Sequence, residues 1–137
     1  MIKVQEVKHL FTEKLATAAA VCGVIPEMEG ELSSRNPGKV RLRCSFRKFE
    51  IIPVSDSENI LSGEVFAEIL YEPGESESAE DLSTRLSQVF APGEVAFQNQ
   101  SFRIQVSSVS FLEQKIEGKY QRTGISFQIT VRGVHDS

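Results

Sequence analysis

Two segments of the chain carry apolar residues at helical spacing. The other segments between and after them alternate apolar and polar residues. In residues 2–22 the apolar side chains recur every three or four positions, which predicts a helix that stops at Gly23, before Pro26. Residues 78–90 repeat this spacing and predict a second, shorter helix. A helix with one apolar stripe needs a sheet or another helix to cover that stripe.

The remaining segments have the period of two that is typical of strands. In residues 40–49, Leu42 and Cys44 face one side while arginines face the other. Residues 64–72 are apolar on both faces, which predicts a central strand. A hairpin that turns at Asn99 and a last strand follow the second helix.

Together these elements predict one domain, residues 1–137, of the α+β class. Consecutive strands with short connections favour a mixed, mostly antiparallel sheet with two helices packed on one face, in the order α-β-β-α-β-β-β. Residues 24–39, 53–62 and 112–124 are predicted to be loops, and residues 134–137 a frayed tail. The expected core contains Leu82, Leu86, Phe102, Ile104, Phe127 and Ile129.

Charge and apolar content exclude some classes of protein. A formal net charge of −4 argues against a nonspecific nucleic-acid coat, which is normally basic. No apolar run approaches the ~20 residues of a membrane helix, and the first residues mix charged and apolar types, so we expect a cytosolic protein. Cys22 and Cys44 have no metal-ligand spacing and are expected to be reduced and buried, while a disulfide between them stays open because spacing does not decide it.

The sequence has no recognisable catalytic set. Its two histidines, His9 and His135, lie on the first helix and in the tail, away from any nucleophile motif. Phosphate-loop, dinucleotide and zinc-protease motifs are absent from the sequence. The acidic cluster of residues 75–81 suits the positive N-terminal end of the second helix. We therefore expect no enzymatic activity, no cofactor and no metal.

The sharpest charged feature is the arginine side of residues 40–49, which carries Arg41, Arg43 and Arg47. Three interpretations stay open. The arginines can protect an edge strand against wrong pairing, or contact the acidic helix end of a neighbouring subunit. They can also bind nucleic acid, with Phe49 as the aromatic residue available for base stacking.

The second half of the chain resembles a known family. "GEVFAEILYEPGESESAEDLSTRLSQVF" joins a strand to a helix, and "FQNQSFRIQVSSVSFLEQKIEGKYQRTGISFQITVRG" adds a hairpin, a polar excursion and a closing strand. This organisation resembles the tail terminator family of tailed bacteriophages, including the lambda tail terminator. The N-terminal helix and "VRLRCSFRKFE" fit the same order, so the resemblance spans nearly the whole chain.

The resemblance implies a hexameric ring without enzymatic activity or cofactor. Such a ring caps the tail tube, stops its polymerisation and offers its other face to head-completion proteins. The implied partners are other copies of the chain, the tube protein and a head-completion or neck protein, with DNA passing through the lumen. The implied location is the host cytoplasm during assembly, and then the head-proximal end of the virion tail.

Two alternatives stay open beside the terminator: a neck, tail-completion or head–tail connector protein, and a small nucleic-acid-binding module that uses the arginine strand. In a ring, we expect opposite charges of adjacent subunits to face one another, with residues 53–62 and 112–124 contributing contacts. The candidate subunit-interface residues are Arg41, Arg43, Arg47, Glu77, Glu80, Asp81, Lys115 and Lys119.

Overall fold

The computed structural model describes residues 3–28, 39–54, 59–93 and 95–133. Within these residues it contains two helices and seven strands in the order α-β-β-β-α-β-β-β-β, which confirms the α+β class. The elements are α1 (Val4–Ala20), β1 (Pro26–Met28), β2 (Val40–Pro53), β3 (Asn59–Tyr71), α2 (Ser76–Ser87), β4 (Val95–Gln98), β5 (Phe102–Phe111), β6 (Lys115–Glu117) and β7 (Tyr120–Gly133).

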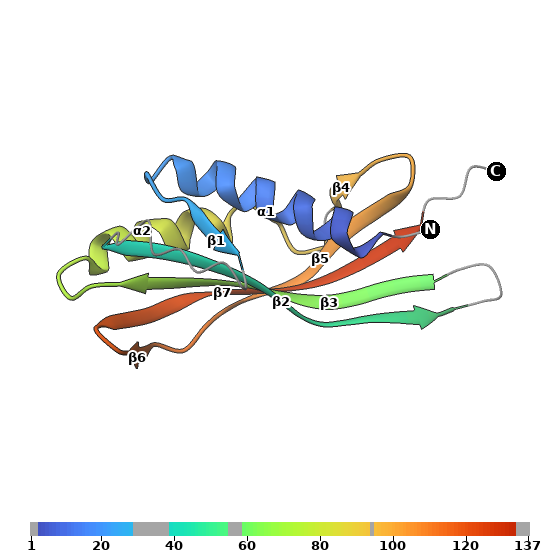
Figure 1. Ribbon diagram of the computed structural model, residues 1–137. Coiled ribbons are helices and arrows are strands. Elements are labelled where there is room, and N and C mark those ends of the chain that lie inside the picture. Colours follow the sequence, from blue (N-terminus) through green and yellow to red (C-terminus); the bar gives the residue numbers. More distant parts are fainter. Residues whose placement is uncertain (1–2, 29–38, 55–58, 94, 134–137) are drawn as a thin grey trace.

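All seven strands form one mixed sheet. Its order is β1-β2-β3-β7-β5-β4, and β6 pairs with β7 beyond the end of β5. β1 is parallel to β2, while the other pairs are antiparallel. β3 lies between β2 and β7, as predicted for a strand with apolar residues on both faces. Both helices cover the same face of this curved sheet (Figure 1).

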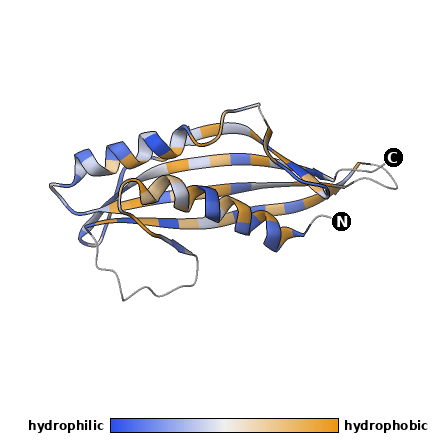
Figure 2. Cartoon of the chain, turned by 90° about the horizontal axis from the view of Figure 1, so that it is seen from above, coloured by the Kyte–Doolittle hydropathy of each residue, from blue (hydrophilic) through white to orange (hydrophobic). Residues whose placement is uncertain are grey.

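The core lies between that face and the helices. Figure 2 shows apolar residues recurring along the strands beneath α1 and α2. Phe90 joins the layers, because its ring centroid is 4.9 Å from that of Phe11 in α1 and 5.2 Å from that of Phe127 in β7. The predicted core is confirmed, since its six members are buried in one cluster: Leu82, Leu86, Phe102, Ile104, Phe127 and Ile129.

α1 is shorter than predicted, and α2 is shifted towards the N-terminus. α1 ends at Ala20, within the predicted span of 2–22, and the chain turns at Gly23 with a left-handed φ of 73°. α2 begins at Ser76 and ends at Ser87, instead of spanning 78–90. The amides of Gln88 and Val89 donate to carbonyls three residues back, at 3.2 Å each, so the chain leaves the α-helix in a tighter turn.

The predicted loops are shorter than expected, because each contains strand residues. β1 lies within residues 24–39, the start of β3 lies within 53–62, and β6 lies within 112–124 together with the start of β7. β1 and β6 are three residues long, too short for a period-two pattern to identify them. The rest of these predictions lies outside the described residues, namely 29–38, 55–58 and the predicted tail 134–137.

A bulge in β2 lets two phenylalanines face the helices. The register with β3 shifts between Arg47 and Glu50, and Lys48 has a φ of 56°. Phe49 therefore lies on the covered face, where its ring occupies the space that a Cβ of Gly63 would need. The Phe49 ring is 5.7 Å from that of Phe46, and its half-buried position on the helix side leaves it less available for the base stacking that the nucleic-acid interpretation would require.

Truncation of the core tests this packing. We expect Leu86→Ala and Phe127→Ala each to lower the free energy of unfolding by about 2–5 kcal/mol, because both side chains are fully buried. Urea denaturation followed by circular dichroism measures the change. Ile116→Ala is the control, since that side chain is 82% exposed and its loss should change stability by less than about 0.5 kcal/mol. Equal midpoints for all three variants would contradict the assigned core.

Candidate interaction surfaces

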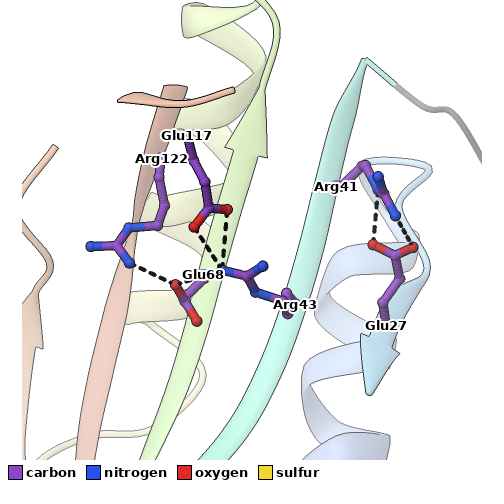
Figure 3. Close-up of polar contacts among 6 residues, drawn as sticks. All are labelled: Glu27, Arg41, Arg43, Glu68, Glu117 and Arg122. Atoms are coloured by element: carbon purple, nitrogen blue, oxygen red, sulfur yellow. Dashed lines mark hydrogen bonds and ion pairs between the residues drawn. The ribbon is translucent and has the colours of Figure 1, made fainter. Parts of the chain in front are cut away.

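One face of the sheet is not covered by the described helices, and we call it the uncovered face. It carries a buried carboxylate between two arginines. Strand register places Arg43 of β2 beside Glu68 of β3, with their side chains on the same face. Arg43 Nη2 lies 3.1 Å from Glu68 Oε2, and Arg122 Nη1 of β7 lies 3.0 Å from the same oxygen (Figure 3). The Glu68 side chain is only 4% exposed, so two charge-assisted hydrogen bonds compensate its burial.

The hairpin of β6 and β7 folds across this face. Glu117 of β6 lies 3.3 Å from Arg43 Nη2, although β7 and β3 separate β6 from β2 in the sheet. Lys119, in the turn of the hairpin, lies 3.6 Å from Glu72. Figure 1 shows the β6 end of the sheet bending away from the helices. The hairpin thus covers Glu68 on a face that no described helix covers.

Gly124 permits a close approach of β7 to β3 at this point. It pairs with Glu68, has a φ of 150°, and a Cβ in its place would overlap the carbonyl oxygen of Ala67. The pairing of β7 also changes here, from β5 on one side of Gly124 to β6 on the other.

The three predicted interface arginines each have a partner within the chain. Arg41 Nε lies 2.9 Å from Glu27 Oε2, and a second guanidinium nitrogen of Arg41 bonds the other oxygen of this carboxylate. The Arg47 guanidinium lies 4.8 Å from the centroid of the Phe66 ring. Reversing the charge at Arg43 would place a carboxylate against Glu68, so that change would disturb the fold as well as any subunit contact.

Electrostatics agree with this pairing. Burial by itself would lower the pKa of the Arg43 guanidinium, but the hydrogen bond to Glu68 and the charges of Glu68 and Glu117 raise it overall. The hydrogen bond to Glu27 likewise raises the pKa of Arg41. The raised pKa values of both arginines thus agree with their pairing to carboxylates of the same chain.

The predicted acidic residues lie elsewhere. Glu77, Glu80 and Asp81 are exposed on α2, on the covered side of the sheet, so one chain does not bring them to the arginines. Lys115 is exposed in β6, on the same hairpin as Lys119. The acidic part of the predicted loop 53–62, residues 56–58, lies outside the described residues.

Between the end of α1 and α2 lies a groove of about 580 Å³ that the sequence analysis did not identify. It is lined by Val21, Cys22, Ser78, Asp81, Thr84, Arg85 and Gln88. Val21 belongs to the apolar stripe of the first helix, yet its side chain is 67% exposed. Helical periodicity predicts which side of a helix is apolar, but not how far along the helix the covering layer extends.

No metal centre or membrane helix appears among the described residues. No group of three or more His, Cys, Asp and Glu side chains in this part of the chain is placed to hold a metal ion. His9 is exposed on α1, with Nε2 3.2 Å from Glu13, and His135 lies outside the described residues. Neither described helix is long and apolar enough to cross a membrane.

The two cysteines are free thiols in different surroundings. Burial in the core raises the pKa of the Cys44 thiol to about 12, whereas Cys22 is half-buried at the groove. The prediction that both cysteines are buried is thus correct for Cys44 only.

Thiol labelling tests this difference. At pH 8 we expect about one thiol per folded chain to react rapidly with a disulfide reagent, because the raised pKa keeps Cys44 in the unreactive neutral form. The second thiol should react only after unfolding. Cys22→Ser is the control that should abolish the rapid phase. Two rapidly reacting thiols in the parent would contradict the burial of Cys44.

The buried carboxylate gives a second test. Glu68→Gln should lower the free energy of unfolding by about 2–4 kcal/mol, because the neutral amide leaves Arg43 and Arg122 without their shared counter-charge. Urea denaturation measures the loss. Glu80→Gln removes an exposed charge from α2 and should have an effect below about 0.5 kcal/mol. If the two variants are equally stable, Glu68 does not hold the uncovered face together.

Comparisons with known proteins support the fold. No known family model and no curated protein sequence matches the chain. One solved structure, whose name carries no functional description, superposes with a TM-score of 0.73 over 100% of this chain and 99% of that one. The two sequences are 15% identical, so the chain is similar to that protein in fold alone.

Proposed function

We propose that the chain is a structural subunit of a bacteriophage tail, a tail terminator whose copies form a hexameric ring on the end of the tail tube. In this role it stops tube polymerisation and offers a surface to the head-completion or neck protein. The ring assembles in the host cytoplasm and remains at the head-proximal end of the virion tail. Its function is to form contacts, without catalysis or a cofactor.

The observation that carries this proposal is the distribution of exposed apolar side chains. Ile51, Ile52 and Val54 are exposed at one end of the sheet, and Phe111 and Ile116 at the other. Exposed apolar residues that gather at particular sites favour contacts with other proteins. A subunit with such residues at both ends can contact one neighbouring subunit at each end. Alternatively, it can contact the tail tube at one end and the neck protein at the other.

The nucleic-acid alternative has less support. The guanidinium groups of Arg41 and Arg43 are bound to carboxylates, and Arg47 lies against Phe66, so phosphates would have to compete for them. Phe49, the aromatic residue considered for base stacking, is half-buried beside Gly63. A neck or connector protein would share the features that favour a terminator, and the experiment below separates the two by location.

Electron microscopy with tail tubes tests the proposal. The protein is mixed with purified tubes of the phage that encodes it, and tube protein is then added. We expect a ring at one tube end and no further elongation, while sedimentation gives six times the 15.2 kDa mass of one chain. Tubes without the protein are the control and should elongate. A parent protein that stays monomeric with tubes present contradicts the proposal, and binding to heads but not to tubes favours the neck protein.

A further inference from the structure

The uncovered face ends in a row of two isoleucines and two arginines. Register pairs Ile52 with Ile60, Ile60 with Arg132 and Arg132 with Arg103, so the four side chains lie on the same face as Glu68. The residues next to them in β3 and β7, Leu61 and Val131, are buried on the opposite face. Ile52 is 46% exposed and Arg132 is also exposed, while Ile60 and Arg103 are half-buried. We call these four residues the basic row.

The charge of the basic row is not compensated by the described part of the chain. Arg103 and Arg132 stand opposite each other on neighbouring strands. Two like charges in this arrangement destabilise the strand pairing. No described carboxylate forms an ion pair with either, in contrast to Arg43 and Arg122 at the other end of the face. Two arginines beside two isoleucines suit a partner surface that offers carboxylates around an apolar site.

The same chain presents such a surface on α2. Glu77, Glu80 and Asp81 are exposed, and none of them pairs with a described basic residue. Asp81 lines the groove between α1 and α2 together with the exposed Val21. Arg85 is also at the groove, one helical turn beyond Asp81. Asp81 and Arg85 are the two charged residues of the groove lining, whereas Glu77 and Glu80 are exposed on α2 outside that lining. We use the name acidic groove for the surface of Glu77, Glu80, Asp81 and Val21, whose three carboxylates outnumber the one arginine.

The two surfaces cannot meet within one chain. The basic row lies on the uncovered face at the end of β7, whereas the acidic groove lies on the helix side at the opposite end of the sheet (Figure 1). Contact between them therefore requires a second copy. Because one surface of each copy would meet a different surface of the next, the contact is head-to-tail, and such contacts close into rings when the rotation allows.

We propose that the basic row of one copy docks into the acidic groove of the next. This inference rests on the proposed ring and identifies the surfaces that join its subunits. Arg103 and Arg132 face Glu80 and Asp81 of the neighbour, while Ile52 and Ile60 approach Val21. The charges set orientation and association rate, and the apolar contacts contribute most of the affinity. The interface arginines are thus Arg103 and Arg132, and not the internally paired Arg41 and Arg43.

A charge-reversal pair tests the docking. One variant carries Arg103→Glu and Arg132→Glu, and the other carries Glu80→Lys and Asp81→Lys. Each variant alone places like charges against each other, so its assembly should need more than about tenfold higher concentration than that of the parent. In an equimolar mixture every contact again joins opposite charges, so the two variants should assemble in alternation. Sedimentation velocity measures assembly, on tubes if the parent requires them.

Controls separate docking from folding and from net charge. Circular dichroism must show both variants folded, and an unfolded variant is replaced by one with Gln at the same positions, which should also weaken assembly. Lys3→Glu with Lys115→Glu makes the same change in net charge as the arginine variant, outside both surfaces, and should assemble like the parent. Labelling of Cys22, which lines the groove, should slow when the parent assembles.

The outcomes distinguish the two proposals. If the parent assembles but a folded reversal variant assembles equally well, the docking inference is wrong while the ring stands. The inference is also wrong if the parent assembles and the mixture of reversal variants does not. If the parent does not assemble with tubes present, the proposed function fails, and the docking inference fails with it.

Discussion

The structure depends on one aromatic contact that joins segments from across the chain. Phe90, just after α2, contacts Phe11 of α1 and Phe127 of β7, and Phe97 of β4 lies 5.8 Å from Phe11. Each of these elements has a single apolar side. Exposure of that side to water is unfavourable in free energy, so another element has to cover it. By meeting at one point, the two helices and two strands cover each other. Both helices therefore lie on the same face of the sheet.

The position of both helices on one face determines the chemistry of the other face. No described helix covers that face, and the chain buries Glu68 there by surrounding it with the long side chains of Arg43 and Arg122 and by folding the β6–β7 hairpin over them. Arginine suits this position, because its apolar stem covers the strand while its planar head bonds the carboxylate. At its far end the same face carries Arg103 and Arg132, which form no ion pair with a described carboxylate, so the described parts of its two ends differ in charge. An asymmetric subunit of this kind suits head-to-tail assembly.

Most of the fold was predictable, because a buried side of a helix or strand appears in the sequence as a periodic pattern of apolar residues. The helices, the central β3 and the core residues from Leu82 to Ile129 follow from apolar periods of 3.6 and two. β1 and β6 show no such apolar pattern, since each is three residues long and β6 is exposed throughout. Pairing with β2 and β7 holds these strands in place, and backbone hydrogen bonds do not require a particular side-chain pattern.

The sequence by itself determined which side of each element is apolar and where charge gathers. Only the tertiary structure decided which charges are paired. Arg43 meets Glu68 at a separation of 25 residues and Glu117 at 74, so neither contact is visible in a local pattern. Register likewise brought Arg103 opposite Arg132. The physical reason is that periodicity reports one element's exposure to its surroundings, whereas an ion pair depends on how distant strands align and where a hairpin folds.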